Sequence, residues 1–541
     1  MRSKHFRGAR TPLFNSVRRS MRLARNANRP DAPPLDELVE IAPTMSKRGR
    51  WTRRRFLKTS GAGALALAGG GLLTSCARMK GAPRIAIIGA GLAGLNAAYQ
   101  LKKLGHRADV YEASKRTGGR IYTVKDALAP GLVTEVGGEW LNATDEDTLS
   151  LAEEFGLHLS DMWAPSEVVG LESLHLFEGK RYNEPQLIEA FQPIAALMED
   201  DLAAFEIWDN DEEEGAEEAE VRVAELDGIS VAEYLENIGA TGWVRDLLDV
   251  TTTVESSMPT DQQSAINLVY SIAGKPGERV PGFLTMDFER YKVVEGCQEV
   301  TNGLAERLDE GQVKFGHRLE AVRSSGDGFT LTFQGPGGAA SDVKADFVIM
   351  TVPFSILRDI EMRMELPDIK KKAIAELGYG SNSKLALGVH RRVWREQGYQ
   401  GNTYSDEPFQ SMYDNSENEG YLGEIGGFTL YSGGQAGIDL GEGTAQDQVE
   451  RLMPGVERAY PGVTAELNGN VQRFVWHSYP FAKGSVPCRK VGQWTTIAYM
   501  EGDPVGNMFF AGDHCSWDFG FINGATESGR RAAEEIAARL G

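Results

Sequence analysis

The chain has 541 residues, of which 41% are hydrophobic and 25% are charged, as expected for a water-soluble globular protein with more than one domain. This composition excludes a polytopic membrane protein, a wholly disordered chain and a fibrous repeat. The net charge is −20 although the first 80 residues are basic, so the body is strongly acidic and nucleic-acid binding is not expected. Four cysteines without a close pair predict neither a disulfide framework nor a metal site.

Residues 1–80 form a basic leader in the expected organisation. Residues 1–44 are rich in arginine and show no convincing hydrophobic period, so we expect them to be disordered. The chain then reads Thr-Arg-Arg-Arg-Phe-Leu-Lys from Thr52 to Lys58, followed by small apolar residues from Gly61 to Leu73. This order resembles a bacterial twin-arginine signal, and the apolar run is too short for a transmembrane helix, which needs ~20 residues.

The leader ends in Leu73-Thr74-Ser75-Cys76, which resembles a lipobox with Cys76 as the candidate lipid-bearing residue. An incidental cysteine is the alternative. The resemblance implies export by the twin-arginine machinery, to the periplasm or to a membrane as an anchored lipoprotein. Met1 and Met45 both stay open as the natural start.

A βαβ unit opens the folded body. Residues 84–88 form a predicted strand, apolar residues recur at helical spacing as far as Leu104, and residues 108–112 form the next predicted strand. This order of elements is typical of a nucleotide-binding domain.

The turn within this unit carries the pattern G-x-G-x-x-G at Gly89, Gly91 and Gly94. The first glycine permits a tight turn, the second lets the backbone approach a pyrophosphate, and the third lets helix and strand pack closely. Glu112 ends the second strand, where a carboxylate can accept hydrogen bonds from both ribose hydroxyls. The pattern predicts a dinucleotide with an unphosphorylated ribose and leaves NAD and FAD both open.

A second pattern follows at once, with Arg116, Gly118, Gly119 and Arg120 spaced as R-x-G-G-R. Two guanidiniums and two glycines can bring charge and bare backbone against a diphosphate, although a plain basic turn is the alternative. The two patterns together resemble the flavin-containing amine oxidase family, which includes monoamine oxidases, polyamine oxidases and L-amino-acid oxidases. The resemblance implies FAD as the cofactor.

The run Gly137-Gly138-Glu139-Trp140-Leu141 matches the Gly-Gly-x-aromatic segment that runs beside the isoalloxazine in this family. The resemblance implies that Gly138, Glu139 and Trp140 contact the cofactor and that Trp140 also faces the substrate. Snake-type L-amino-acid oxidases carry an arginine near this position that holds the substrate carboxylate. This chain has none there, which weighs against amino-acid substrates.

Two segments near the C-terminus match the block that closes the flavin site in the family, residues 509–514 and residues 520–525. The resemblance implies that Asp513 accepts hydrogen bonds from the ribityl chain. It also implies a helix whose positive N-terminal end stabilises negative charge on the flavin. The cofactor contacts implied by this block are Gly512, Asp513, Phe521, Ile522 and Ala525. For the adjacent His514 and Cys515 we expect a structural role.

Lys384 lies in a predicted strand and is followed by Trp394, an arrangement that resembles the strand whose lysine holds a water near the hydride-accepting flavin nitrogen. The resemblance implies a catalytic role for Lys384, and an exposed strand lysine is the alternative. Trp476 matches a further family position and is implied to contact the cofactor.

The segment 481–486 indicates how the flavin is attached and what faces the substrate. Mammalian monoamine oxidases carry their flavin-linked cysteine where this chain has Ser485, so we expect non-covalent FAD. Their aromatic cage has tyrosines where this chain has Val486 and Phe521. We therefore expect both side chains to face the substrate, Phe521 through dispersion and a weak cation–π contact, with a plain core role as the alternative.

The expected fold is α/β (α+β), with a Rossmann-like FAD-binding domain built from discontinuous segments and an inserted substrate domain of mixed sheet and helices. The expected FAD-binding segments are 81–150, 286–355 and 476–541. The expected substrate domain comprises 151–285, which reads as mainly helical, and 356–475. An acidic run at 209–220 is interpreted as a solvated face.

The sequence thus favours an exported FAD-dependent oxidase of amines, or of L-amino acids, that uses dioxygen and releases imine and hydrogen peroxide. A related enzyme acting on C–C bonds, such as a desaturase or a protoporphyrinogen oxidase, is the nearest alternative. An NAD-dependent dehydrogenase and an exported binding lipoprotein with a nucleotide fold are the others.

Overall fold

A computed structural model describes residues 12–29, 32, 82–162, 171–209, 214–273, 290–416 and 425–541. The twin-arginine motif, the apolar run after it and Cys76 lie outside these residues, so the expectations about them stay predictions. Within the described ranges, no helix is both long and apolar enough to span a membrane.

A five-stranded parallel sheet is assembled from segments far apart in the sequence, in the order β22-β13-β1-β2-β9. Ile85 of the central strand lies beside Phe347 on one side and Ala108 on the other. Parallel sheets are covered on both faces, which explains the uninterrupted run Ile-Ala-Ile-Ile in β1. The strands are β1 (Ile85–Ile88), β2 (Ala108–Glu112), β9 (Val313–Phe315), β13 (Phe347–Met350) and β22 (Met508–Phe510).

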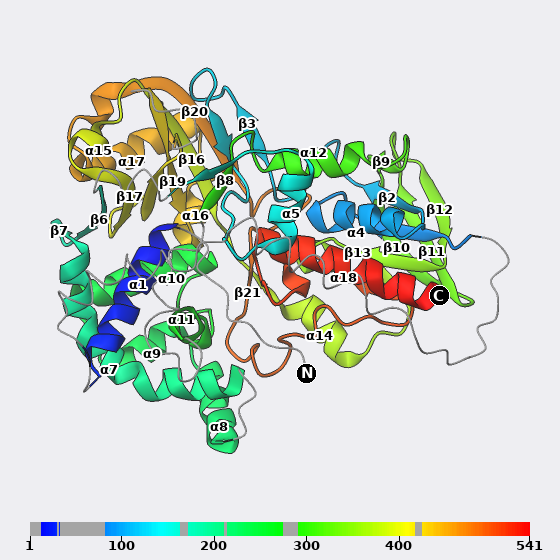
Figure 1. Cartoon of the computed structure of the whole chain (residues 1–541), viewed down its shortest axis with the longest axis horizontal. Helices are drawn as coiled ribbons and strands as arrows, with labels where there is room; N and C mark the ends of the chain where they lie inside the picture. Colours follow the sequence, from blue (N-terminus) through cyan, green and yellow to red (C-terminus); the bar gives the residue numbers. More distant parts are fainter. Residues whose placement is uncertain are drawn as a thin grey trace.

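Alternate residues of β1 enter two different cores. Ile85 and Ile87 pack with helices on one face of the sheet, and Ala86 and Ile88 pack with a second, four-stranded sheet on the other. Figure 1 shows these layers in the right half of the molecule. The helices are α4 (Leu92–Lys103), α12 (Gln298–Glu306) and α18 (Ile522–Leu540). The second sheet has the order β12-β11-β10-β14 and contains β10 (Arg318–Ser325), β11 (Gly328–Gln334), β12 (Ala340–Ala345) and β14 (Glu361–Arg363).

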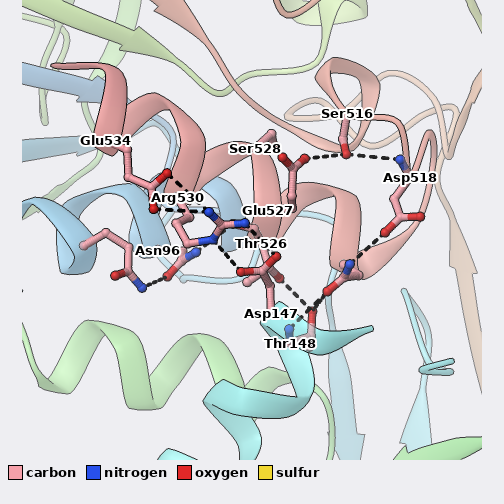
Figure 2. A network of polar contacts seen from close by, with 12 residues as sticks. Asn96, Asp147, Thr148, Ser516, Asp518, Thr526, Glu527, Ser528, Arg530 and Glu534 are labelled. Carbon is pink, nitrogen blue, oxygen red and sulfur yellow. Dashed lines mark hydrogen bonds and ion pairs between the residues drawn. The ribbon is translucent and has the colours of Figure 1, made fainter. Parts of the chain in front are cut away.

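Polar contacts fix helix α18 against α4 and against α5 (Glu146–Glu154), as Figure 2 shows. Asn96 of α4 donates its side-chain amide to the Thr526 carbonyl at 2.7 Å. The hydroxyl of Thr148 lies 2.8 Å from that of Thr526, and the Arg530 guanidinium pairs with Asp147 at 2.6 Å. Because the two threonines and Asn96 are buried, these bonds hold the N-terminal half of α18 in one orientation.

A seven-stranded mixed sheet forms the upper left of Figure 1, in the order β20-β16-β19-β18-β17-β6-β7. All seven residues of β16 are buried: Leu385 and Leu387 pack into one apolar core, and Ala386 packs into another. Its strands are β6 (Glu172–Phe177), β7 (Lys180–Tyr182), β16 (Ser383–Val389), β17 (Tyr399–Ser405), β18 (Ser411–Asp414), β19 (Gly426–Ser432) and β20 (Leu467–Val475). The associated helices are α15 (Val393–Glu396), α16 (Gly434–Asp439) and α17 (Ala445–Ala459).

Short ribbons connect the parallel sheet to the mixed sheet. They consist of β3 (Thr123–Lys125) with β4 (Val133–Glu135), β5 (Leu159–Asp161) with β8 (Tyr291–Val293), and β15 (Gly378–Tyr379) with β21 (Pro487–Cys488). Two helices, α13 (Phe354–Leu357) and α14 (Asp368–Glu376), come after β13 in the chain. The ribbons matter for function because β4 and β8 carry charged side chains into the interior.

A group of helices with its own apolar core lies below the mixed sheet in Figure 1 and is called the helical domain below. It comprises α7 (Glu184–Asp209), α8 (Ala216–Asp227), α9 (Val231–Asn237), α10 (Gly242–Ser256) and α11 (Ile266–Ile272). A capping box starts α9: the Ser230 hydroxyl accepts from the Glu233 amide at 3.2 Å, and the Glu233 carboxylate accepts from the Ser230 amide at 2.8 Å.

A further helix, α1 (Pro12–Ala27), packs into this domain, so the expected disorder of residues 1–44 is wrong for this stretch. Phe14, Val17 and Met21 are each no more than 2% exposed in the shared core. Ala24 is buried as well, and these four residues recur at three- and four-residue spacing along one helical face. The high arginine content hid this face in the sequence.

Two arginines of α1 complete its attachment. Arg22 donates to the carbonyl oxygens of Ile272, at 3.0 Å, and Ala273, at 2.6 Å, and so satisfies carbonyls at the C-terminal end of α11. Arg25 forms ion pairs of 2.6 Å with Glu199 and Glu206 of α7. The basic residues of this helix therefore serve the fold of the helical domain.

Candidate active site

A cavity of about 550 Å³ extends from the glycine turn after β1 to the N-terminus of α18. It brings together residues from all three segments expected to bind FAD, and from β16 of the mixed sheet. The residues singled out in the sequence that line it are Gly89, Gly91, Glu112, Arg116, Gly118, Gly119, Arg120, Gly138, Glu139, Trp140, Lys384, Trp476, Val486, Gly512, Asp513, Phe521, Ile522 and Ala525. Their roles toward a cofactor stay predictions.

Gly94, the third glycine of the first pattern, does not line the cavity. A Cβ atom at Gly94 would lie 2.1 Å from the Gly89 carbonyl oxygen and 2.9 Å from the Thr351 hydroxyl, so only glycine lets α4 start this close to β1 and β13. Gly89 itself has φ of +109°, which L side chains rarely adopt.

The two glycine patterns lie side by side. Gly91 forms a parallel bridge with Gly118, and a Cβ on Gly119 would approach the Gly91 Cα to 3.3 Å. Two stretches of bare backbone therefore face the same part of the cavity, next to the N-terminus of α4. A pyrophosphate fits this place, because the free amides and the dipole of the helix favour a negative charge.

The Glu112 carboxylate lies at the end of β2 and is 8% exposed. Its two oxygens accept hydrogen bonds from the amides of Ala90 and Ser114, each at 2.7 Å. A carboxylate has about four acceptor positions, so Glu112 keeps capacity for the hydroxyl groups of a ribose.

The two arginines of the second pattern have different partners. Arg116 donates to the carbonyls of Thr117 and Ile121 and lies 4.2 Å above the Tyr122 ring, so it braces its own loop. Arg120 crosses the cavity wall and pairs with Asp513 at 2.9 Å, which joins the first segment of the chain to the last.

Asp513 is nearly buried and strongly ionised. Burial alone would raise its pKa, but the charge of Arg120 and the interaction with His514 outweigh burial and lower the pKa of Asp513 to about 2. The carboxylate is thus an acceptor at every physiological pH. This suits hydroxyl groups of a bound cofactor.

Lys384 is buried, and its ammonium has three protein acceptors. It donates to the Glu139 carboxylate and the Gly137 carbonyl, each at 2.9 Å, and to the Glu135 carbonyl at 3.1 Å. The alternative of an exposed strand lysine is therefore wrong. Lys384 is instead a fixed charge in the cavity wall.

Glu139 accepts from two lysines at once. The ammonium of Lys292, on β8, lies 2.5 Å from Glu139 Oε1, whereas Lys384 and the Tyr413 hydroxyl, at 2.7 Å, share Oε2. Burial opposes ionisation of Glu139, but the two ammonium charges prevail and lower its pKa. A second carboxylate, Glu135, lies behind this group, and burial, together with the charge of Glu139, raises its pKa to about 7.

Aromatic side chains form the wall next to this charged group. Trp140 contacts Tyr413 edge to face, with ring centroids 4.7 Å apart. The Trp476 indole donates to the Val136 carbonyl at 2.7 Å, which fixes its plane. Trp140, Trp476, Val486 and Phe521 all line the cavity, and these four side chains are called its apolar end below.

Ser485 forms neutral hydrogen bonds in the cavity wall. Its hydroxyl donates to the Asn382 side chain at 3.2 Å and accepts from the Asn382 amide at 3.1 Å. The three cysteines within the described ranges, Cys297, Cys488 and Cys515, are buried, and none of them forms a disulfide with another. Burial raises the pKa of Cys515 to about 12, which makes it a poor nucleophile.

Sequence reasoning missed Lys292, Glu135, Tyr413, Tyr431 and Asn382. The last two line the cavity, and Tyr431 lies opposite Lys384 in the β16–β19 pair. The available signal was a charge inside an apolar run, as in Tyr-Lys-Val-Val around Lys292 and Leu-Val-Thr-Glu-Val around Glu135. A buried charge in such a run needs a partner, but the run does not say which.

A cavity lined by two glycine patterns, by the Glu112 and Asp513 carboxylates and by aromatic side chains beside a lysine is typical of a dinucleotide-dependent oxidoreductase. A family model described as flavin containing amine oxidoreductase matches residues 92–537. The chain belongs to this family of flavin-dependent enzymes.

Individual relatives match most of the chain. The chain is similar to a pseudooxynicotine dehydrogenase of Pseudomonas sp, 25% identical over 513 residues, covering 90% of this chain and 96% of the relative. It is also similar to a flavin-dependent L-tryptophan oxidase of Lentzea aerocolonigenes, 24% identical over 485 residues, covering 85% and 99%. A putrescine oxidase bound to putrescine shares the fold, with a TM-score of 0.69, 24% identity and coverage of 84% and 99%.

Proposed function

We propose that the protein is an FAD-dependent oxidase acting on the C–N bond of an amine. The amine loses two electrons and two protons to become an imine, which water converts into an aldehyde or keto acid and ammonia. Dioxygen takes up two electrons and two protons and leaves as hydrogen peroxide. The cavity that joins Gly89 to Phe521 carries this proposal, because a dinucleotide and a reacting group need one continuous slot.

The residues that would hold FAD follow the length of the cavity. Glu112 would bind the ribose, the backbone at Gly91 and Gly119 would bind the pyrophosphate, and Asp513 would bind the ribityl hydroxyls; all four residues line the cavity. Ser485 cannot form a thioether, so attachment is non-covalent. When bound, FAD supplies the electron acceptor that amino-acid side chains lack.

The side chains at the apolar end would orient the substrate. Trp140, Val486 and Phe521 exclude water and place the carbon that loses hydride. Lys384 and Lys292 bring positive charge to the same region, which disfavours a charged ammonium substrate. We therefore expect the neutral amine to react and the rate to rise toward alkaline pH.

Amines are favoured over amino acids as substrates. Arginines of the described cavity wall already have acceptors: Arg116 binds loop carbonyls, Arg120 pairs with Asp513, and Arg318 pairs with Glu320. A substrate carboxylate would have to displace one of these partners. An apolar primary amine needs no such displacement.

The test is a screen of primary amines, polyamines and L-amino acids on flavin-loaded protein, with hydrogen peroxide and ammonia measured together. We expect both products in equal amounts from apolar amines, and neither from protein without flavin. Peroxide without ammonia from a saturated C–C substrate would instead favour the desaturase alternative. Purified protein that neither contains nor takes up FAD would contradict the proposal.

We further propose export of the folded enzyme by the twin-arginine route, with Cys76 as the lipid anchor. The order of basic, small apolar and Leu-Thr-Ser-Cys residues supports it. The test compares cell fractions for the natural chain and for a variant with Arg53 and Arg54 both replaced by lysine. Periplasmic or membrane-bound activity should be lost in the variant, and Cys76→Ala should release activity from the membrane. Equal distribution of all three proteins would contradict export.

A further inference from the structure

Lys384 uses all of its hydrogen-bonding capacity on the protein. Its three acceptors are the carbonyls of Glu135 and Gly137 and the Glu139 carboxylate, between 2.9 and 3.1 Å away. An ammonium has three N–H donors and no lone pair. Lys384 is therefore held as a cation whose position is set by the loop from β4 to Trp140.

The Glu139 carboxylate would be neutralised by Lys384 alone, yet a second ammonium lies against its other oxygen. The side chains of Lys292 and Glu139 are 6% and 2% exposed, and their charged atoms are 2.5 Å apart. Two buried ammonium groups on one buried carboxylate leave a net positive charge as long as Glu135 is protonated, and burying a net charge costs stability.

Lys292 does not line the cavity, but it lies near Trp140, which does. Lys292 Nζ lies 5.2 Å from the centroid of the Trp140 ring and 5.7 Å from that of Tyr413. Lys384 lies 5.5 and 5.7 Å from the same two rings. Trp140, which does line the cavity, is thus in contact range of both ammonium groups.

We propose that Lys292 and Glu139 are positioning residues for dioxygen reduction. Glu139 fixes the Lys384 ammonium in the cavity wall, and Lys292 supplies the second charge that keeps the group positive. The inference rests on the proposed oxidase function. The step it serves is the transfer of two electrons from reduced flavin to dioxygen, with two protons taken up to give hydrogen peroxide. Negative charge develops on oxygen before the protons arrive, and a fixed cation stabilises it.

Among the described residues, four other ionisable groups face the cluster formed by Lys292, Lys384 and Glu139, and the net charge of the cluster depends on which of them ionise. They are Glu135 on β4, Cys297 at the start of α12, Tyr413 on β18 and Tyr431 on β19. Burial raises the pKa of Cys297 and of Tyr413 far above neutral, so both stay uncharged. Glu135 is the group that changes charge near neutrality, and the cluster becomes less positive when it ionises.

The experiment measures the reduction potential of the bound flavin and the rate at which photoreduced enzyme reacts with dioxygen. Photoreduction needs no amine, so the result is independent of whether an amine is a substrate. Lys292→Met should lower the potential and slow reoxidation about tenfold or more, because a unit charge is lost from a buried site. Lys292→Arg, which keeps the charge, should restore most of the rate.

Glu139→Gln tests the positioning role separately. Two ammonium groups would then face each other without a carboxylate, so one of them loses its proton more easily. A buried lysine with a lowered pKa titrates roughly between pH 6 and 9, and its neutral form is favoured in the folded state. The folding stability of this variant relative to wild type should therefore increase as pH rises through that range. This melting experiment requires no flavin turnover.

Lys370→Met is the matched control, since Lys370 is also a buried lysine, but it donates to the Met500 and Glu501 carbonyls and does not line the cavity. It should lower the melting temperature while leaving the reoxidation rate near wild type. Unchanged potential and unchanged reoxidation in both Lys292→Met and Glu139→Gln would overturn the inference. Absence of any amine substrate, with Lys292→Met still slow, would overturn the proposed function and leave the inference standing.

Discussion

The parallel sheet and the helical domain are encoded in different ways. The turn after β1 is specified by backbone requirements at single positions, such as Gly94, where a Cβ would lie 2.1 Å from a carbonyl oxygen. The helical domain depends on apolar faces that find one another across more than 150 residues, as Phe14 of α1 does with the core of α7. A substitution at a single position of the turn should therefore have a severe local effect. A substitution in the helical domain should instead lower the stability of the whole domain by an amount that depends on the apolar volume removed.

The largest effect is expected for Gly94→Val. Its side chain cannot fit between the Gly89 carbonyl and Thr351, so α4 must move away from β1 and the pyrophosphate site is lost. The variant should be purified without flavin or should fail to fold, as shown by the absorption spectrum and by circular dichroism. Gly156→Ala is the control for crowding, since nothing lies within 4 Å of its Cβ position. Its φ of +72° strains an alanine, so this variant should lose about 1–2 kcal/mol of stability while its flavin content stays normal. Normal flavin content in Gly94→Val would contradict the assigned role of this turn.

Met21→Ala should act on the helical domain alone. A fully buried methionine replaced by alanine costs about 2–5 kcal/mol, so the melting temperature should fall while the flavin spectrum stays unchanged. Leu197→Ala on α7 is a suitable control, because Leu197 is 54% exposed and its loss should cost less than about 0.5 kcal/mol. A melting temperature equal to wild type would mean that α1 does not pack as described.

Lys384→Met should sharpen the comparison, because it removes a charge from the cavity wall on β16, which belongs to neither of the two regions. We expect the reaction of reduced enzyme with dioxygen to slow about 10²-fold, the size typical for loss of one preorganised electrostatic group. Stopped-flow reduction by amine should change much less. Lys125→Met removes an exposed lysine and serves as the control. Equal slowing of both half-reactions would show that Lys384 supports the fold rather than oxygen chemistry.

The smallest effect is expected for Glu135→Gln. The pKa of Glu135 is raised above its value in the unfolded chain, so wild type loses stability as pH rises from about 4.5 to about 7. Glutamine does not ionise, so the melting temperature of the variant relative to wild type should increase across that window and then level off. A difference between the two proteins that is constant with pH would contradict the raised pKa.

The sequence reveals much of the parallel-sheet domain because its signals are local. Gly89, Gly91, Glu112 and Arg120 could be assigned to one site from spacing and a family resemblance, and the structure places them around one cavity. Local motifs suffice there because a phosphate-binding turn needs particular residues at adjacent positions.

The pairing of Lys292 with Glu139 and the packing of α1 escaped prediction for a common reason. Lys292 and Glu139 are neighbours only in space, and neither residue type reveals its partner. The apolar face of α1, with Phe14, Val17 and Met21, was hidden by the high arginine content, which led us to expect disorder. Pairing across long distances is decided by packing, which a single sequence does not record.

The most direct test of the account is an anaerobic titration of the flavin-loaded protein with an apolar primary amine, followed by air. We predict that the yellow absorbance bleaches as amine is added and returns with oxygen, with one hydrogen peroxide formed per flavin. A flavin that stays oxidised under every amine, yet accepts electrons from a reduced nicotinamide or a C–C substrate, would contradict the central claim.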